Sequence, residues 1–372
     1  MTDPEFTRHG ISLSDSRKMH SLADDSIDVV VTSPPYPMIE MWDVQFASVD
    51  AAIGTALSNE DGGRAFGLMH AALDEVWSEC HRILRPGGLA CINIGDATRK
   101  IGGEFRLFSN HSRILQKMAS LGFSILPDIL WRKPTNAPNK FLGSGMLPAG
   151  AYVTYEHEYI LIVRKGGPRR FSPEEKARRR RSAFFWEERN VWFSDVWVDL
   201  VGARQPLGNE EVDVREARAR SAAFPFELAY RLIQMHSLIG DTVLDPFLGT
   251  GTTTAAAIAS GRSSMGFEIE GMLERLICNA IEAAVPLGRE CAQRRLGSHL
   301  DFVQSREGAG RPCKHVNRHY GFAVVTSQET DLQFAVPREA VAGAEGTFFA
   351  YHEPAQLSTR SEQIQLPLAS TS

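Results

Sequence analysis

The sequence predicts an α/β fold built on a mostly parallel sheet. Runs rich in strand-forming residues alternate along most of the chain with helical patterns, which is the order expected of βα units. One run, "IDVVVT" at Ile27–Thr32, ends on the sequence "SPPY". Another, "TVLD" at Thr242–Asp245, leads into a glycine turn and an Ala-rich helix, as at the carboxyl edge of a parallel sheet.

Each expected element has a local reason. Strands are expected where apolar and β-branched residues run between turn signals, at Ile27–Thr32, Gly88–Ile94, Ile125–Trp131, Tyr159–Arg164, Thr242–Asp245 and Ser264–Glu268. Helices are expected at Phe66–Leu84, Ser109–Leu121, Pro225–Ser237 and Thr252–Ser260. The first of these ends at "RPGG" and the second at Gly122, because glycine and proline stop helices.

The βα alternation is interrupted at three places. Between Trp42 and Gly63 a stretch of acidic and small residues predicts a long loop with some helix. From 168 to 223 the alternation fails, and residues 164–189 hold ten Lys or Arg against four Glu, a net charge of +6. This charge run fits a solvated helix face as well as a polyanion site. From about Asp331 the composition predicts a loosely ordered tail.

Composition limits the class of protein. A chain of 372 residues with 43% hydrophobic residues suffices for one large α/β domain with insertions, or for two domains. The formal net charge of −5 requires any polyanion site to be local. Five scattered cysteines without a CxxC pair predict reduced thiols, and no run approaches the ~20 apolar residues of a membrane span. We therefore expect a cytoplasmic protein.

The glycine loop "DPFLGTG" predicts a cofactor site. Gly249 and Gly251 permit backbone angles and a close ligand approach that a side chain blocks. The loop is neither GxGxxG nor a phosphate loop, and Asp245 at the strand end repels phosphate but attracts ammonium. Glu268 ends the next strand, where an acid accepts hydrogen bonds from ribose hydroxyls. The two acids predict S-adenosylmethionine (SAM); the alternative is a glycine pair that only makes a tight turn.

The loop "SPPY" has the parts of a methyl-acceptor site for an exocyclic base amine. Such an amine is a weak nucleophile, because its lone pair is delocalised into the ring. The Ser33 hydroxyl and the Pro34 carbonyl can each accept one of its N–H bonds. Pro34 and Pro35 stiffen the loop, and Tyr36 offers a ring for stacking. A base in duplex DNA would have to be flipped out to reach them.

With these two motifs in this order, the chain resembles the DNA amino-methyltransferases of the β type. In that family the SPPY-like loop comes first, a target-recognition region lies in the middle, and the FxGxG loop comes late. The segments "RILRPGGLACINIGD", "ILWRKPTNAP" and "FPFELAYRLI" add to the likeness, which spans about residues 10–290 except the middle region. It implies a Rossmann-like SAM-dependent methyltransferase fold, with a mostly parallel seven-stranded sheet, helices on both faces and a circularly permuted motif order.

The resemblance also assigns residues and domains. The catalytic residues would be Ser33, Pro34, Pro35 and Tyr36. The SAM-binding residues would be Asp15, Thr32, Phe224, Pro225, Asp245, Pro246, Phe247, Gly249, Thr250, Gly251, Thr252 and Glu268. The domains would be a catalytic half (1–167), a target-recognition region (168–223), a SAM-binding half (224–300) and a C-terminal extension (301–372).

The implied activity is site-specific methylation of double-stranded DNA. The serine form of the loop is mostly associated with N4 of cytosine, in a restriction-modification system with a partner endonuclease; N6 of adenine is the nearest alternative, and a catalytically idle DNA-binding protein is another. The basic segment then predicts phosphate contacts by Arg178, Arg179, Arg180 and Arg181. No metal is expected: Cys313, His315 and His319 fit a surface loop better. Trp131 fits the core and the base pocket equally well.

Overall fold

A sheet of eleven strands runs through the residues that the computed structural model describes, which are 6–133, 142–200 and 224–357. Its order is β11 (Val196–Trp197), β7 (Ile129–Arg132), β10 (His157–Lys165), β3 (Leu84–Ile94), β2 (Ile27–Thr32), β12 (Thr242–Asp245), β13 (Ser263–Phe267), β1 (Phe6–Ser12), β17 (Thr347–Pro354) and β16 (Ala335–Ala342). The short strand β6 (Phe123–Ile125) pairs with β10. The central run from β3 to β1 is parallel throughout, so its carboxyl ends share one edge.

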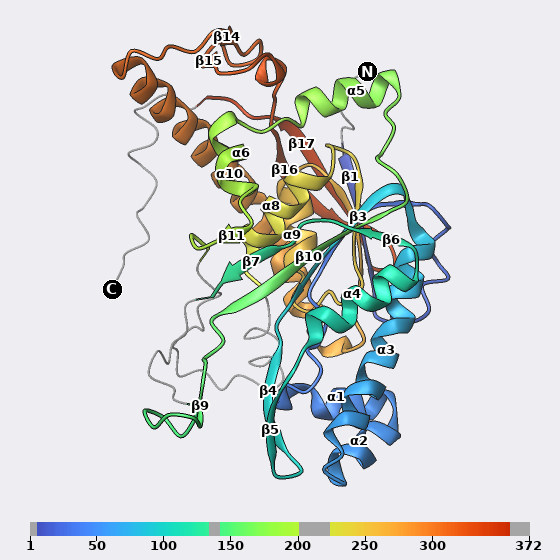
Figure 1. Ribbon diagram of the computed structural model, residues 1–372. Coiled ribbons are helices and arrows are strands. Elements are labelled where there is room, and N and C mark those ends of the chain that lie inside the picture. Colours follow the sequence, from blue (N-terminus) through green and yellow to red (C-terminus); the bar gives the residue numbers. More distant parts are fainter. Residues whose placement is uncertain (1–5, 134–141, 201–223, 358–372) are drawn as a thin grey trace, which may run out of the picture.

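Helices cover both faces of this sheet (Figure 1). One face carries α1 (Asp43–Val49), α2 (Ala51–Ser58), α3 (Gly62–Ile83) and α4 (Asn110–Ser120). The other carries α8 (Phe226–His236), α9 (Thr252–Ala259) and α10 (Glu274–Gly308). Strand β2 shows why both faces are needed, because Val30 packs into the first layer while Val29 and Val31 pack into the second.

Smaller elements surround this core. Beyond the carboxyl edge of the sheet extend two hairpins, β4 (Ala97–Ile101) with β5 (Glu104–Phe108) and β8 (Leu142–Gly143) with β9 (Ala151–Tyr152). The rings of Phe105 and Tyr152 stack at 4.9 Å and join them. Within the described ranges, the remaining elements are α5 (Pro173–Arg181), α6 (Trp186–Trp192), β14 (His315–Val316), β15 (Ala323–Val324) and three 3-10 turns at Glu40–Trp42, Gly271–Leu273 and Ser327–Glu329.

The predicted α/β class, the mostly parallel centre of the sheet and the helices on both faces are confirmed. The sheet is wider than the seven strands expected, since β11, β6 and the pair β16–β17 extend it. The strand expected at Ile125–Trp131 is divided into β6 and β7, with Pro127 in the break between them. Most of the loop expected between Trp42 and Gly63 is helical, in α1 and α2.

The loosely ordered tail expected from about Asp331 is wrong for residues 335–354. Strands β16 and β17 form an antiparallel pair, and β17 also pairs with β1 over Phe6–Gly10. Ala350 is fully buried between them, and Phe334 and Val336 join a core cluster with α10. The β1–β17 pairing joins residues more than 300 positions apart, so composition near the C-terminus carried no signal of it.

Candidate active site

Both predicted loops line one cavity of about 330 Å³ at the carboxyl edge of the parallel strands. Its wall includes twelve of the predicted site residues: Asp15, Ser33, Pro34, Pro35, Tyr36, Phe224, Pro246, Phe247, Gly249, Thr250, Thr252 and Glu268. Thr32, Pro225, Asp245 and Gly251 are not part of this wall. The fold therefore joins segments more than 200 residues apart into a single site.

The glycine loop needs its glycines for two different reasons. Gly249 has φ of +56° and Gly251 has φ of +87°, in the left-handed region that side chains disfavour. Gly251 caps α9, and a Cβ there would lie 3.2 Å from the Ile277 backbone. A Cβ at Gly249 would meet no atom closer than 3.9 Å, so this position leaves open space beside the cavity.

Asp245 lies behind this loop and organises it. Its carboxylate accepts hydrogen bonds from the Thr32 hydroxyl at 2.5 Å, the Thr253 hydroxyl at 2.6 Å and the Phe247 backbone N–H at 3.0 Å. Burial raises the pKa of Asp245 to about 6 although these donors oppose the rise. Asp245 is not part of the described cavity wall, and its hydrogen bonds join β2, β12 and α9, so its contact with a methionine ammonium stays a prediction from the sequence.

Glu268 reaches the cavity itself. Its two oxygens accept the backbone N–H groups of Gly249 and Glu270, each at 2.8 Å. Burial raises the pKa of Glu268 to about 7. A carboxylate keeps lone pairs free beyond these two bonds, so Glu268 can also accept hydroxyl groups, as the sequence predicts. Nearby, Asp15 lines the cavity with its carboxylate bound to Arg17 at 2.6 Å.

The catalytic loop is held from the neighbouring strands. The Ser33 hydroxyl donates to the Asn93 backbone carbonyl at 3.1 Å, with the Tyr36 hydroxyl 3.2 Å away. The Tyr36 hydroxyl donates to the Glu158 carboxylate at 2.9 Å. Burial raises the pKa of Tyr36 well above its usual range, and the nearby Glu158 charge adds to the rise. Tyr36 therefore remains a protonated donor.

Several residues of the site were not found from the sequence. Trp42, Gln45 and Phe46 form part of the cavity wall from the segment predicted as a loop. Lys133 and Glu158 also line the cavity, from the ends of neighbouring strands β7 and β10. The sequence offers one signal for Glu158, which is a charged residue directly before the apolar run "YILIV". The partners of its carboxylate depend on strand pairing and could not be predicted.

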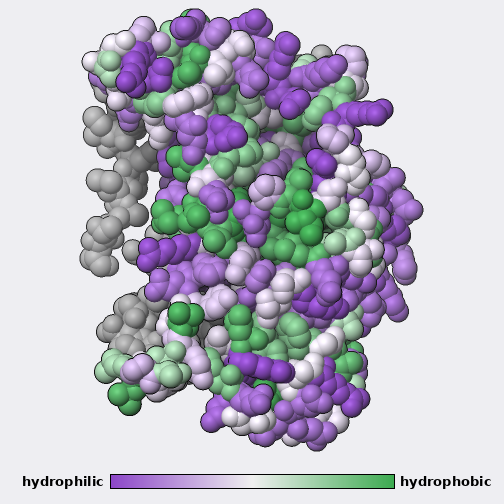
Figure 2. Space-filling model, viewed as in Figure 1, coloured by the Kyte–Doolittle hydropathy of each residue, from purple (hydrophilic) through white to green (hydrophobic). Residues whose placement is uncertain are grey.

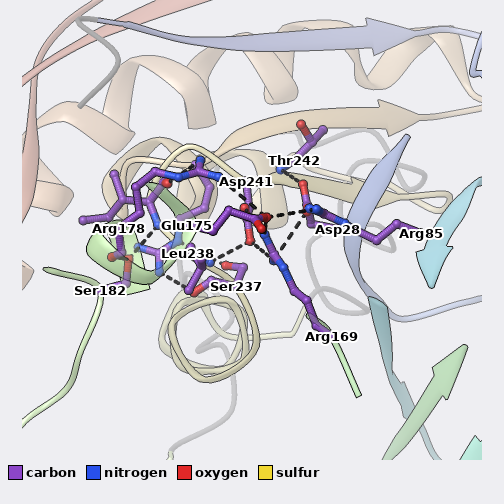
Figure 3. Close-up of polar contacts among 12 residues, drawn as sticks. Asp28, Arg85, Arg169, Glu175, Arg178, Ser182, Ser237, Leu238, Asp241 and Thr242 are labelled. Carbon is purple, nitrogen blue, oxygen red and sulfur yellow. Dashed lines mark hydrogen bonds and ion pairs between the residues drawn. The ribbon is translucent and has the colours of Figure 1, made fainter. Parts of the chain in front are cut away.

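The basic run Arg178–Arg181, at the end of α5, lies away from the cavity. Arg178 donates to the carbonyl of Ile239, just before β12, so α5 sits at the amino-terminal edge of the sheet (Figure 3). There Arg169 pairs with Asp241 and Asp28. In this charged cluster are Asp28, Arg85, Arg169, Glu175, Arg178 and Asp241. The structure therefore does not bring Arg178–Arg181 together with the cavity, which opens at the opposite edge.

Two further candidates are placed by the structure. Trp131 is 1% exposed, its indole N–H donates to the Leu200 carbonyl, and it belongs to the core rather than the cavity wall.

Among the residues described, no group of three or more His, Cys, Asp or Glu side chains is arranged to hold a metal ion. In the same residues no helix is both long and apolar enough to cross a membrane.

The chain belongs to the DNA methylases that modify N6 of adenine or N4 of cytosine, since the model of that family matches residues 27–278. It is 48% identical over 364 residues to the Type II methyltransferase M.MthZI of Methanothermobacter thermautotrophicus, covering 97% of this chain and 99% of the relative. It is 51% identical over 282 residues to the Type II methyltransferase M.MjaI of Methanocaldococcus jannaschii, covering 73% and 90%.

A solved structure supports the same class of protein. A putative DNA modification methylase from Thermus thermophilus, complexed with S-adenosyl-L-methionine, is similar with a TM-score of 0.56 and 32% identity, covering 75% of this chain and 96% of that one. The protein is therefore an enzyme, a SAM-dependent DNA methyltransferase with the α/β methyltransferase fold. The residues present fit SAM, because Glu268 offers acceptors and Gly249 leaves room at the cavity wall.

Proposed function

We propose that this enzyme methylates the exocyclic N4 amine of cytosine at a specific site in double-stranded DNA, within the cytoplasm and as part of a restriction-modification system. One observation carries the proposal: the Ser33 hydroxyl and the glycine loop line the same cavity. A positioned hydroxyl next to a cofactor site suits transfer to a neutral, weakly nucleophilic amine. SAM, when bound, would supply the methyl group from its sulfonium sulfur, which leaves as a neutral thioether while the amine loses one proton to solvent.

Ser33 is suited to accept a hydrogen bond from the target amine. Its own proton is directed to the Asn93 carbonyl, which leaves the hydroxyl lone pairs for another donor. A bond from the amine to Ser33 draws the nitrogen lone pair away from the ring and toward the incoming methyl group. The Pro34 carbonyl, also at the cavity wall, is the proposed second acceptor.

The cavity requires the base to leave the duplex. Its wall combines Tyr36 with the apolar side chains of Ile39, Trp42 and Phe46, which exclude water and present faces to a planar ring. We propose that the duplex docks at the carboxyl edge, where the two hairpins extend. Met146 and Leu147 in the turn between β8 and β9 are 81% and 70% exposed, Val153 directly after β9 is 81% exposed, and Figure 2 shows hydrophobic residues at the tip of this hairpin.

The choice of cytosine over adenine rests on Ser33, since the serine form of this loop resembles that of the N4-cytosine enzymes. Nucleoside mass spectrometry of DNA from cells expressing the chain tests it. N4-methylcytosine is the expected product. N6-methyladenine would overturn the assignment of the base while leaving the class of enzyme intact.

Two other proposals need separate tests. A catalytically idle DNA-binding protein would transfer no tritium from labelled SAM to DNA, whereas the enzyme proposed here incorporates label. The relatives named Type II methyltransferases support a partner endonuclease, whose cleavage of DNA should be blocked by prior methylation with this enzyme. Cleavage that methylation leaves unchanged would argue against that particular pairing.

A further inference from the structure

Glu158 is the centre of a hydrogen-bond cluster that reaches the catalytic loop from two strands away. One oxygen of Glu158, Oε2, accepts from the Tyr36 hydroxyl at 2.9 Å and from the Asn93 side-chain amide at 2.7 Å. The same amide also donates to the Tyr36 hydroxyl at 2.8 Å. The other oxygen, Oε1, accepts from the Lys133 ammonium at 2.9 Å. The Glu158 side chain is 12% exposed and Asn93 is 2% exposed, so the bond between them is shielded from water, whereas the Lys133 side chain is 44% exposed.

The sheet register explains how these groups meet. Strands β10, β3 and β2 are neighbours, and Tyr159 pairs with Ile94 while Ile160 pairs with Asn93. Glu158 therefore stands beside Gly95, the residue that follows β3. The position of Tyr36 depends on that glycine, because a Cβ at Gly95 would lie 3.0 Å from the Tyr36 ring and 3.4 Å from Glu158 Cγ.

The cluster determines where the Tyr36 ring and the Ser33 hydroxyl sit. The Tyr36 hydroxyl is bound by a carboxylate and an amide on one side and lies 3.2 Å from Ser33 Oγ on the other. Ser33 in turn donates to the backbone carbonyl of Asn93. Asn93 thus holds both loop residues, one through its main chain and the other through its side chain.

We propose that Glu158 is a positioning residue for methyl transfer, which acts through the hydroxyl of Tyr36 to hold the SPPY loop against the target base. Lys133 pairs with the other oxygen of the same carboxylate. Hydrogen bonds to a charged group are stronger than neutral ones, so this anchor limits rotation of the Tyr36 side chain. The inference rests on the proposed function in one respect, because it requires a DNA base that this enzyme methylates.

A double-mutant cycle tests it with single-turnover rates on a DNA duplex that the parent enzyme methylates. Glu158→Gln removes the charge, and Tyr36→Phe removes the hydroxyl but keeps the ring. Each should slow methyl transfer roughly 10- to 100-fold, the range for one hydrogen bond to a charged group. The double variant should be no slower than Tyr36→Phe alone, because both changes remove one interaction. SAM affinity, measured by calorimetry, should stay within about twofold.

Glu156→Gln is the matched control. Glu156 is two residues away, and among the contacts described its side chain pairs only with the exposed Arg132, at 3.3 Å, so this variant should match the parent rate. Full-rate transfer by Glu158→Gln, or a double variant slowed by the product of the two single effects, would overturn the proposal. If Glu158→Gln does not fold, Tyr36→Phe alone decides: parental speed contradicts the role of the hydroxyl.

These outcomes are separate from failure of the proposed function. If the parent methylates adenine instead of cytosine, the same cycle runs on that product. If the parent transfers no methyl group to any DNA, the proposed function fails, and the role assigned to Glu158 fails with it.

Discussion

The hydroxyl of Ser33 is a small group with a large expected effect, because it is the acceptor nearest the proposed reaction. Ser33→Ala should leave SAM affinity near its parental value, since Ser33 makes no hydrogen bond with the glycine loop among the contacts described. The methyl-transfer rate should fall by a factor of ~10² to 10³, by analogy with removal of one positioned hydrogen-bonding group in other enzymes. Single-turnover rates with and without the change measure this.

A Ser33→Ala enzyme as fast as its parent would mean that the hydroxyl only ends strand β2. Ser33→Thr is the control variant, because it retains a hydroxyl at the same position. Partial recovery of rate in Ser33→Thr, compared with Ser33→Ala, would attribute the loss to the missing acceptor.

Glu268 should make SAM affinity depend on pH. Its pKa is raised to about 7 by burial, and hydroxyl groups of a ligand bind better to the ionised acceptor. Affinity should therefore rise as pH increases toward about 7 and change little above it, with a slope of up to about tenfold per pH unit on the acid side. Calorimetric titrations from pH 5.5 to 8 would measure the slope, with those values chosen as roughly one to two units around the pKa.

The stability of the ligand-free protein should move in the opposite direction. A carboxyl whose pKa is raised on folding favours the folded state at low pH, and this contribution is lost as pH rises through about 7. Glu268→Gln should reduce both pH dependences. Asp245 shows the same direction of shift, so the comparison with Glu268→Gln is needed to separate the two acids.

At the scale of elements, helix α5 is a basic helix whose attachment is electrostatic. Its capping box at Ser172 and Glu175 starts the helix, and Glu175 then pairs with Arg85 and Arg169. Part of the positive charge of this segment is therefore neutralised by acids of the amino-terminal edge of the sheet. The net charge of +6 read from residues 164–189 overstates what a polyanion would meet.

Arg179→Ala combined with Arg180→Ala should leave DNA affinity and its salt dependence unchanged, because α5 lies at the edge away from the cavity. Lys100→Ala on the β4–β5 hairpin should weaken binding and reduce the log–log salt slope by about 0.9, the effect of one lost phosphate contact. Binding titrations at several salt concentrations measure both. A reduced slope in the α5 variant would restore the phosphate contacts that the sequence predicts for this run.

At the scale of the whole molecule, the C-terminal hairpin completes the sheet. Strand β17 pairs with β1, which pairs in turn with β13 beside the cofactor site. A chain ending at Asp331 loses this cover and the buried side chains of Leu332, Phe334 and Val336. At about 1.5–3 kcal/mol for each buried side chain, its melting temperature should fall by on the order of 10 °C.

A chain ending at Leu357 is the control, because it retains every contact described for β16 and β17. Thermal unfolding followed by circular dichroism compares the two truncations. Equal melting temperatures would show that the hairpin adds nothing to the stability of the sheet.

The sequence by itself determined the α/β class, the strands β2 and β12, and the two loops that follow them. These features are local: a β-branched run, a glycine pair and a proline pair act through the backbone of a few adjacent residues. The parallel order of the strands then placed both loops at one edge, so that the residues Ser33 to Tyr36 and Gly249 were found without coordinates.

Only the tertiary structure decided the parts that depend on partners distant in the chain. The position of Asp245 after a strand predicts a ligand contact, and only the structure shows that its oxygens also accept hydrogen bonds from Thr32 and Thr253. The position of Arg178 in a basic run predicts a phosphate contact, but in the structure its guanidinium donates a hydrogen bond to the Ile239 carbonyl. Glu158 had no motif at all, because its role depends on the register between β10 and β3. The physical reason is the same in each case: charge and hydrogen-bond capacity are properties of a residue, whereas the group that satisfies them is chosen by the fold.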